Sequence, residues 1–406
     1  MAKIEGKNII VVGIQPWDIK IGSNCKNIAR EFARHNRVLY VNFPLDRATL
    51  FKERQTEKIQ KRLAARRGKI PRLEKEEENL WVYYPPTIIE SLNWLPWPWL
   101  FDILNKRNSR LFAKDIKAAL KELEFNNYII FNDSSMFLGL YLKEYLQPKF
   151  YIYYMRDYLV KNPYWRKHGL RNEPLLIAKA DLVVCNSTLY AEYGAQYNKH
   201  SYMVGQGCDT TLFNDDIQPI EIAEELTKIP RPIIGYVGAL ASRRLDIALI
   251  EYIARQRPQW SIVLVGPEDD NFKNSALHNL PNVYFLGPKP EHILPTYIKG
   301  FDVAMNPQLV NDATMGNYPR KIDEYLAMGK PTIASATKAM EYFEGYAYIA
   351  HSHEEYITLI EKALKEDSPE LQARRKSYGR SHTWENNVAL IYHYIELVCR
   401  EKGIEL

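Results

Sequence analysis

The chain has 406 residues and a net charge of +5, with 46% hydrophobic and 25% charged residues. This length is sufficient for two or three domains, and the composition excludes both a small disulfide scaffold and a disordered chain. The charge is uneven, because residues 52–72 carry nine lysines and arginines against two glutamates, and the remaining chain is slightly acidic. A general polyanion-binding protein would spread its positive charge over more of its surface.

The four cysteines lie far apart, without a CxxC pair. This spacing favours a reducing compartment and separate packing roles for the thiols. The first residues show no basic segment followed by an apolar one, and no run of about 18 apolar residues occurs in the sequence. We therefore expect a cytoplasmic protein without a signal peptide or a membrane span.

Short apolar runs alternate with amphipathic helical stretches, a pattern typical of parallel sheets covered by helices. The runs IIVVG and IVLVG are apolar throughout, as expected of strands buried on both faces. Strands are predicted at 8–13, 38–43, 128–132, 150–154 and 182–186, and then at 232–238, 261–266, 282–287, 302–306 and 331–335.

The two halves begin alike, each with an apolar strand, a loop and an amphipathic helix. We predict an α/β fold of two Rossmann-like doubly wound domains, at 1–212 and 213–383, that face each other across a cleft. The segment 205–232 is the predicted crossover. Ligands of such sheets bind outside the carboxyl ends of the strands, so the chemistry is expected in the loops that follow them.

The strongest functional pattern lies between residues 305 and 335. Asn317 is a predicted N-cap for a helix that ends at Gly329. The first turn of this helix carries Arg320 and Lys321, although the helix dipole disfavours positive charge there. A phosphate bound to the free amides would explain both cations, and two solvated side chains are the alternative.

Glu324 lies on the same predicted helix face as Arg320 and Lys321. Its carboxylate either forms an ion pair with these cations or accepts hydrogen bonds from the ribose hydroxyls of a nucleotide.

A second anion-binding turn is predicted after Gly238, where Arg243 and Arg244 precede a helix. An ordinary surface loop with two exposed arginines is the alternative. The loop that begins at Gly266 contains three acidic residues. We interpret it as a hydrated loop rather than a metal site, because no histidine is near it in the sequence.

A set of short motifs resembles, in its order and spacing, the family 4 retaining glycosyltransferases, which have the glycosyltransferase-B architecture. The motifs are ADLVVCNS at 180–187, GQGCDTTLF at 205–213, GYVGAL at 235–240, LPNVYFLG at 280–287, FDVAMNP at 301–307 and PRKIDEYLAMGKPTIAS at 319–335. The resemblance implies a nucleotide-sugar donor, UDP-linked or else GDP-linked, in the second domain and an acceptor in the first. It also implies that a carboxy-terminal helix, 384–406, completes the first domain and that no metal or other cofactor is required.

Carried over by position, Glu324 matches the second glutamate of the family's paired motif, a ribose contact, and Gly316 replaces the first. The family's phosphate-binding lysine is matched by Arg244, and its arginine is replaced by Ala239. We infer that Lys321 restores the missing charge, so that Arg244 and Lys321 stabilise the donor diphosphate during catalysis. The predicted donor-binding residues are Gly238, Arg243, Gly266, Asn317, Tyr318, Arg320 and Glu324.

On the acceptor side, Asp157 follows a strand and is the candidate that orients or deprotonates the acceptor hydroxyl. Asp133, after the preceding strand, competes with it, and a cap or turn role is the alternative for either aspartate. The further acceptor-side candidates are Asp18, Gly22, Ser23 and Arg156.

The basic segment 52–72 is followed by an uncharged segment rich in tryptophan and proline at 91–101. Tryptophan beside lysine and arginine favours an anionic membrane surface, to which each cation contributes about 1 kcal/mol. We therefore consider an inner-leaflet docking site formed by these two segments. A solvated helix and a tryptophan-rich packing loop are the alternative.

The sequence predicts a metal-independent hexosyltransferase of cell-surface polysaccharide synthesis, acting on a glycan or lipid-linked acceptor. A nucleotide-sugar epimerase or hydrolase of the same fold is one alternative. A catalytically silent subunit that binds a sugar nucleotide is another, because Gly316 removes one expected donor contact. A nucleic-acid partner is not expected, since no nucleic-acid motif adjoins the basic segment.

Overall fold

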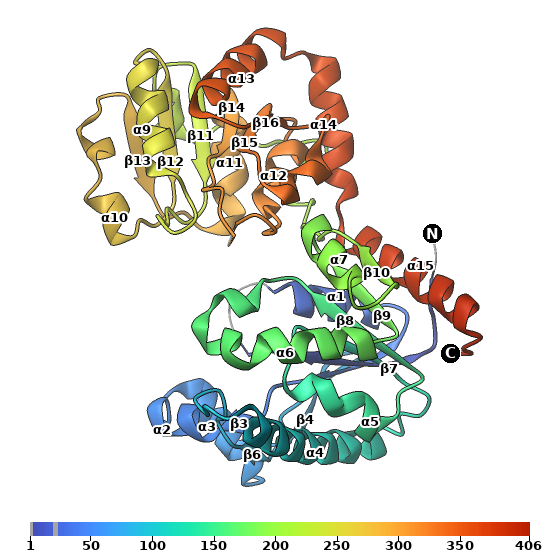
Figure 1. Ribbon diagram of the computed structural model, residues 1–406. Coiled ribbons are helices and arrows are strands. Elements are labelled where there is room, and N and C mark those ends of the chain that lie inside the picture. Colours follow the sequence, from blue (N-terminus) through green and yellow to red (C-terminus); the bar gives the residue numbers. More distant parts are fainter. Residues whose placement is uncertain (1–2, 19–22, 313) are drawn as a thin grey trace. The chain divides into compact units, whose positions relative to one another are not determined.

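The computed structural model describes residues 3–18, 23–312 and 314–406. The chain divides into two compact units (Figure 1). The first unit contains Met1–Gly205 and Asn387–Leu406, and the second contains Gln206–Asn386. The sequence analysis placed these divisions at residues 212 and 383.

The first unit is built on an eight-stranded sheet with the strand order β10-β9-β8-β7-β1-β2-β5-β4. All neighbouring strands in it are parallel except β4 and β5. Its strands are β1 (Asn8–Gly13), β2 (Arg37–Val41), β4 (Leu73–Glu77), β5 (Leu80–Tyr83), β7 (Ile129–Asp133), β8 (Phe150–Met155), β9 (Leu182–Cys185) and β10 (Ser201–Met203). A separate pair joins β3 (Leu45–Asp46) to β6 (Ile88–Ile89).

Helices cover both faces of this sheet. Its α-helices are α1 (Asn24–Ala33), α2 (Arg47–Lys52), α3 (Glu57–Arg66), α4 (Pro98–Glu122), α5 (Leu142–Leu146), α6 (Pro163–Lys179), α7 (Thr188–Ala195) and α15 (Trp384–Lys402). One apolar core contains side chains of α4, α6 and α7. On the other face, Phe32 of α1 packs against Phe131 of β7 and Tyr392 of α15, with ring centres 5.4 and 5.6 Å away. Short 3₁₀ turns lie at Leu138–Tyr141 and Leu159–Lys161.

The second unit is built on a six-stranded parallel sheet with the order β13-β12-β11-β14-β15-β16. Its strands are β11 (Ile233–Val237), β12 (Ser261–Val265), β13 (Val283–Gly287), β14 (Val303–Asn306), β15 (Thr332–Ser335) and β16 (Tyr348–Ala350). Its α-helices are α8 (Glu224–Thr227), α9 (Ile247–Gln256), α10 (Asp270–Lys273), α11 (Leu294–Gly300), α12 (Arg320–Ala327), α13 (His353–Glu366) and α14 (Pro369–Ser381). Helices α9 and α13 share an apolar core with the strands, and 3₁₀ turns lie at Ala276–Asn279, Glu291–Ile293 and Lys338–Phe343.

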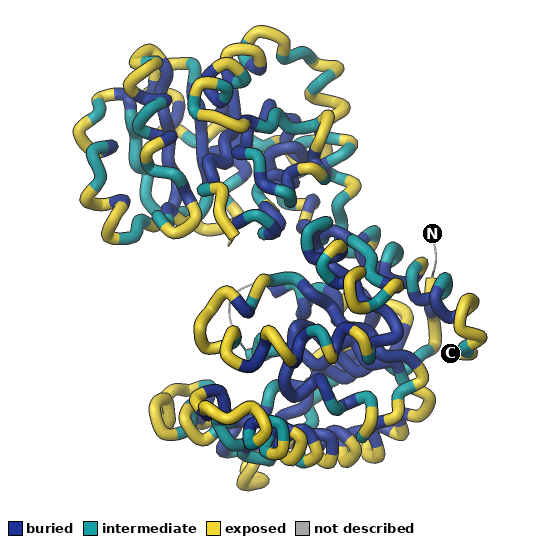
Figure 2. Tube along the Cα trace, in the orientation of Figure 1, coloured by how far each residue is buried: buried dark blue, intermediate teal, exposed yellow. Residues whose placement is uncertain are grey.

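The prediction of two Rossmann-like parallel sheets is confirmed, and the predicted strands are present with shifts of one or two residues at their ends. Most of their apolar runs are dark in Figure 2 because helices exclude water from both faces, whereas the edge strand β13 is only partly buried. Strands β3, β4, β5, β6, β10 and β16 were not predicted. Strand β4 has the sequence LEKEE and lies at a sheet edge, where exposed charged residues are tolerated.

In each sheet the strand order reverses beside the first strand, between β1 and β7 in the first unit and between β11 and β14 in the second. The connections leave the sheet in opposite directions at such a point, so the strand ends there border a crevice. The candidate sites are therefore expected at these two reversal points.

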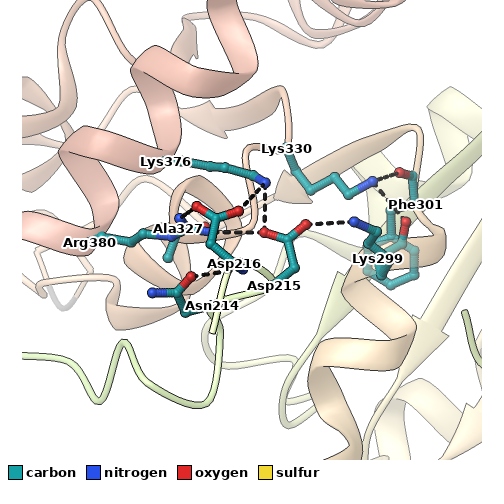
Figure 3. A network of polar contacts seen from close by, with 9 residues as sticks. All are labelled: Asn214, Asp215, Asp216, Lys299, Phe301, Ala327, Lys330, Lys376 and Arg380. Atoms are coloured by element: carbon teal, nitrogen blue, oxygen red, sulfur yellow. Dashed lines mark hydrogen bonds and ion pairs between the residues drawn. The ribbon is translucent and has the colours of Figure 1, made fainter. Parts of the chain in front are cut away.

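The crossover segment is held on the second unit by a cluster of charged side chains (Figure 3). Asp215 accepts hydrogen bonds from Lys299 Nζ at 2.6 Å, Lys376 Nζ at 2.6 Å and Arg380 Nη2 at 2.8 Å. Asp216 also forms ion pairs with Lys376 and Arg380. The segment that enters the second unit is therefore fixed to both α11 and α14.

Candidate functional site

The loops after β11 and β12 lie in direct contact at the reversal point of the second sheet. The amide of Gly238 donates a hydrogen bond to Val265 O at 2.9 Å. A Cβ atom on Gly266 would lie only 1.9 Å from Gly238 O, and both glycines have positive φ, +140° and +153°. A residue with a Cβ atom would therefore clash at Gly266, which is buried, whereas Gly238 is partly exposed.

Lys321 lies beside the first of these loops. A Cβ atom on Gly238 would lie 3.0 Å from Lys321 Cε and 3.1 Å from its Nζ. The ammonium group is also 5.1 Å from the ring centre of Tyr236. Helix α12 is fixed in this position because Tyr325 Oη accepts a hydrogen bond from Val237 N at 2.9 Å. The structure therefore brings Gly238, Gly266 and Lys321 together, as an anion site requires.

Helix α12 begins later than predicted. Its N-cap is Pro319, so the prediction that Asn317 caps the helix is wrong. Asn317 N donates to Thr314 O and closes a preceding turn, after which Pro319 adopts φ −89° and ψ 79°. No side chain caps α12. Its first turn therefore has no side-chain acceptor for its amides, and it carries both Arg320 and Lys321.

Glu324 is buried and forms an ion pair with Arg320, with Oε1 3.1 Å from Nε. Arg320 also lies 3.4 Å from Glu291 Oε1. Burial raises the pKa of Glu324, although the charges of Arg320 and Lys321 oppose this shift. The ion-pair role predicted for Glu324 is present, and the pair lies at the start of α12.

Tyr318 lies in the interior of the second unit. Its hydroxyl donates to Asp323 Oδ1 at 3.1 Å, and His382 Nδ1 lies 2.6 Å from the same oxygen. Tyr318 and Asp323 are both buried. This geometry gives the Tyr318 side chain a supporting position under α12, and its donor contact stays a prediction.

Arg243 and Arg244 are exposed in a turn that is fixed by its neighbours. Ser242 donates to Asp269 Oδ2 from its amide at 2.7 Å and from its hydroxyl at 2.9 Å. Arg244 O accepts a hydrogen bond from Leu309 N at 2.8 Å. Within the described residues, neither arginine forms an ion pair or touches Lys321. The turn is therefore rigid and its positive charge is not neutralised.

The acidic loop after Gly266 has local structural roles. Asp269 caps α10 by accepting a hydrogen bond from Phe272 N at 3.0 Å. Glu268 Oε2 lies 2.8 Å from Nε2 of His278. This histidine was not predicted to be near the loop, because it lies ten residues further along the chain. The described part of the chain contains no cluster of three histidine, cysteine or acidic side chains that could hold a metal ion.

Asn306 is a candidate contact that the sequence analysis missed. It ends β14 at the reversal point and is buried, yet neither polar atom of its side-chain amide has a hydrogen-bond partner among the described residues. A buried amide without partners is costly unless a ligand or water satisfies it. Its position at the carboxyl end of a predicted strand was the signal that could have identified it.

In the first unit, Arg156 connects three loops at the carboxyl edge of the sheet. Its Nε donates to Asp133 Oδ1 at 2.8 Å, its Nη1 to Asp157 Oδ2 at 3.1 Å and its Nη2 to Gln15 Oε1 at 3.5 Å. Burial opposes the charge of Arg156, but the carboxylates of Asp133 and Asp157 outweigh it and raise the pKa of the guanidinium. The predicted residues Asp133, Arg156 and Asp157 therefore form one cluster.

The two candidate aspartates differ in accessibility. The Asp133 side chain is fully buried, whereas 45% of the Asp157 side chain is exposed. A molecule in solution can therefore reach Asp157 more easily than Asp133, which forms an ion pair with Arg156.

Of the remaining acceptor-side candidates, the structure describes Asp18 and Ser23. Asp18 forms an ion pair with Arg62 of α3, with Oδ1 3.6 Å from Nη2. Ser23 is the buried N-cap residue of α1, without a side-chain capping bond. Gly22 lies outside the described residues.

A cavity of about 280 Å³ lies within the first unit, and sequence reasoning missed it. Ile14, Phe43 and Ser135, which follow β1, β2 and β7, line it together with Phe101 and Asn93. The Nδ2 atom of the buried Asn93 has no hydrogen-bond partner in the described chain. The cavity therefore has apolar walls at Ile14, Phe43 and Phe101, and polar residues that include Asp46, Glu90, Ser91 and Asn93 also line it.

The basic segment 52–72 is partly used within the first unit. Arg62 is buried, and its Nη1 donates to Phe43 O at 3.0 Å. Lys61 Nζ lies 3.0 Å from Glu74 Oε2 and 2.8 Å from Tyr84 Oη. These cations hold α3 against the unit and are not available to a membrane.

The tryptophans of the segment 91–101 are exposed. Trp94, Trp97 and Trp99 have exposed fractions of 69%, 55% and 63%. The alternative that this segment is a tryptophan-rich packing loop is therefore wrong for these side chains.

Two sequence comparisons concern the same regions. Residues 231–366, about a third of the chain, match the family model of the group 1 glycosyl transferases. This range contains Gly238, Gly266, Lys321 and Glu324. The Bacillus subtilis teichuronic acid biosynthesis glycosyltransferase TuaH is 27% identical over 220 residues, which cover 52% of this chain and 55% of that protein. The chain therefore aligns with about half the length of this relative.

Solved structures match nearly the whole chain. Sucrose-phosphate synthase from Thermosynechococcus elongatus has a TM-score of 0.65 and 15% identity, with 97% of this chain and all of that chain covered. Anabaena HepE in complex with UDP and glucose has a TM-score of 0.60 and 16% identity, with 97% and 99% covered. The E. coli trehalose-6-phosphate protein bound with UDP-2-fluoro glucose has a TM-score of 0.62 and 11% identity, with 98% and 100% covered. These similarities show the fold, which is the glycosyltransferase-B architecture of two Rossmann-like units.

Proposed function

We propose that this chain is a retaining glycosyltransferase of cell-surface polysaccharide synthesis. It transfers a sugar from a nucleotide-sugar donor, with UDP favoured, to a glycan or lipid-linked acceptor. The observation that carries the proposal is the position of Lys321 against Gly238, on the uncapped first turn of α12 at the reversal point of the second sheet. The family match over 231–366 and the UDP compounds bound by HepE and the E. coli protein support it.

On the donor side, the diphosphate lies over the Gly238 and Gly266 loops in this proposal. Lys321 and the amides of α12 stabilise the charge that develops as the bond to the sugar breaks, and Arg244 adds positive charge from its fixed turn. Glu324 accepts hydrogen bonds from the ribose while it holds Arg320. This stabilisation comes from the cations and amides of the chain, and the proposal needs no metal ion.

On the acceptor side, the exposed carboxylate of Asp157 orients or deprotonates the acceptor hydroxyl. Arg156 forms an ion pair with this carboxylate, and the buried Asp133 forms a second ion pair that fixes Arg156. The apolar walls of the cavity in the first unit suit the apolar part of an acceptor. Orienting the hydroxyl at the anomeric carbon lowers the entropy cost of the transfer.

A second candidate is a catalytically silent subunit that binds the sugar nucleotide. Gly316 favours it, because glycine has no side chain with which to contact the transferred sugar. An epimerase or hydrolase of the same fold would also bind the donor, but would release product without an acceptor.

The place of action in this proposal is the cytoplasmic face of the membrane, to which the chain binds peripherally. Among the described residues, no helix is both long and apolar enough to cross a bilayer. In this proposal the surface of the protein binds the membrane, because a lipid-linked acceptor is held there.

The donor is tested by thermal unfolding of the full chain with UDP, GDP and their sugar derivatives. Stabilisation grows with ligand concentration over its dissociation constant, so the true nucleotide raises the unfolding midpoint in a dose-dependent way. Absence of a shift with every nucleotide contradicts the proposal. Glycosylation of an added acceptor that is lost in Glu324→Ala then excludes the silent subunit, and release of free sugar without an acceptor indicates the epimerase or hydrolase.

A further inference from the structure

Helix α4 (Pro98–Glu122) presents a long cationic face to solvent. The exposed residues recur every three or four positions along 25 residues. At about 100° per residue, they fall within an arc of roughly 100° on one side of the helix. We call this set the α4 stripe: Trp99, Ile103, Lys106, Arg107, Arg110, Lys114, Lys117 and Lys121. Figure 2 shows the exposed residues that recur along α4.

The positive charge of the α4 stripe is not neutralised within the first unit. Throughout the residues that the structure describes, none of its six cations forms an ion pair. Of the three acidic side chains of the helix, Glu122 is exposed at its last residue, and the other two are bound elsewhere. Asp102 binds Arg171 through two hydrogen bonds of 2.7 Å, and the buried Asp115 accepts a hydrogen bond from Thr87 N at 3.0 Å.

The amino-terminal end of the α4 stripe is apolar and exposed. Trp97, Trp99 and Ile103 have exposed fractions of 55%, 63% and 59%, and Trp94 adjoins them. Indole rings are enriched at the interface between hydrocarbon and headgroups, where their apolar body and N–H group are both satisfied. A soluble polyanion would be bound by the cations alone and gives no reason for this row of exposed apolar side chains.

The cations also border a hollow on the surface. Arg107, Arg110, Lys114 and Lys117 line it together with Tyr145, and its volume is about 810 Å³. Four positive side chains around one hollow can converge on a phosphate group. Such groups cover the surface of an anionic bilayer.

We propose that the α4 stripe docks this chain on an anionic phospholipid bilayer. The helix lies in the plane of the membrane, with its tryptophan end in the interface and its six cations over the headgroups. This inference extends the peripheral membrane location in the proposed function. It assigns the contact to α4, because the α4 cations share one helix face with the exposed Trp99 and Ile103, whereas Lys61 and Arg62 of the basic segment are paired within the unit.

The test measures co-sedimentation of the full chain with vesicles of phosphatidylcholine containing about 30% phosphatidylglycerol, and with phosphatidylcholine alone. Wild-type protein binds the anionic vesicles, and salt weakens the binding. The stripe variant combines Lys106→Gln, Arg110→Gln, Lys114→Gln and Lys117→Gln. Each cation strengthens binding about fivefold, so the loss of four cations weakens the binding of this variant about 600-fold.

The matched control removes the same number of exposed cations from the basic segment, as Lys52→Gln, Arg54→Gln, Arg66→Gln and Arg67→Gln. This control variant retains most of the binding. If both variants lose the same amount of binding, the effect is due to total charge and the proposal is overturned. The proposal is also overturned if the stripe variant binds vesicles as tightly as the wild-type protein. Thermal unfolding verifies that both variants are folded.

The tryptophan end is tested separately with Trp99→Ala combined with Ile103→Ala. This variant binds vesicles less tightly but retains wild-type affinity for heparin, a soluble polyanion. Wild-type protein that binds heparin but fails to sediment with anionic vesicles identifies a polyanion partner and overturns the membrane assignment. Neither assay contains donor or acceptor, so the outcome is independent of the proposed glycosyl transfer.

Discussion

Lys321 is the residue on which the proposed donor site depends most. Its ammonium group lies beside Gly238 and over the ring of Tyr236, and no described carboxylate forms an ion pair with it. A cation held in this way can interact with a phosphate without first breaking an ion pair. The residue types at 320 and 321 indicated this role because they oppose the helix dipole.

Substituting Lys321→Met removes the charge and keeps most of the apolar stem. We expect kcat/KM for glycosyl transfer to fall about 10²-fold, because one preorganised electrostatic contact to the developing charge is lost. Steady-state kinetics and stabilisation by UDP measure the effect. Lys365→Met, at an exposed position of α13, is the matched control and leaves both unchanged. Wild-type kinetics in Lys321→Met would remove this residue from the site.

A buried carboxyl group makes the stability of the first unit depend on pH. Glu173 accepts a hydrogen bond from Tyr153 Oη at 2.7 Å, and its second oxygen has no partner among the described residues. Burial raises the pKa of Glu173 from 4.5 to about 7. The folded state therefore binds this proton more tightly than the unfolded state. The stabilisation is present below about pH 4.5 and is lost as the pH rises to about 7.

Replacing Glu173→Gln removes this titration. At pH 8 we expect the variant to be more stable than wild type by up to about 3 kcal/mol, since it buries no charge. At pH 4.5 the two proteins should have similar stability. Denaturant unfolding at pH 8 and at pH 4.5 tests the prediction. A stability difference between variant and wild type that is the same at both pH values would indicate a packing effect and contradict the titration of Glu173.

The sequence identified the reactive residue types better than it identified their surroundings. It placed both Asp133 and Asp157 after strands, but burial separates the carboxylate that holds Arg156 from the exposed one. Asn306 was missed because an amide has no distinctive pattern, and only its burial without partners draws attention to it.

At the scale of elements, the loops after β11 and β12 together form the proposed donor surface. The sequence predicted each strand and each following glycine. It could not show that Gly266 packs on Gly238 O, because adjacent strands of a parallel sheet are far apart in the chain. The start of α12 was misplaced for a related reason: the turn at Asn317 continues into Pro319 before the helix begins.

Gly266→Ala tests the contact between these loops. The added methyl group would lie 1.9 Å from Gly238 O, at a φ of +153°, so we expect a loss of roughly 2–3 kcal/mol in unfolding free energy. Stabilisation by UDP should also disappear. Gly287→Ala is the control, because its φ is +68° and a Cβ atom there meets nothing within 4 Å. Its cost is about 1 kcal/mol with UDP stabilisation intact. Equal costs in the two variants would contradict the close-contact explanation.

At the scale of the whole molecule, the charged cluster around Asp215 fixes the crossover segment to the second unit (Figure 3). Burial disfavours the charge of Asp215. Hydrogen bonds from Lys299 and Lys376 outweigh this effect and hold its pKa well below the usual range. The contribution to stability is therefore present above about pH 4 and is lost as the pH falls further, because the folded carboxylate resists protonation.

Asp215→Asn keeps the shape of the side chain and removes its charge. At pH 7 we expect it to lower the unfolding free energy by about 2 kcal/mol, because three cationic groups lose their anionic partner. The difference from wild type should shrink as the pH falls below about 4. Thermal unfolding across this range measures it, with Asp270→Asn at an exposed ion pair as the control. A constant difference at all pH values would argue against the ion-pair explanation.

The sequence by itself determined the α/β class, the strands that form the two sheet cores, and the segment that carries the cations of the proposed donor site. Local patterns suffice for these, because strand burial, helix periodicity and glycine after a strand depend on residues close together in the chain. Tertiary structure decided which charges are available. Lys61 and Arg62 turn inward to Glu74 and Asp18, whereas the six cations of the α4 stripe remain unpaired. Whether a charge is neutralised depends on groups brought from distant parts of the chain, which the sequence order does not show.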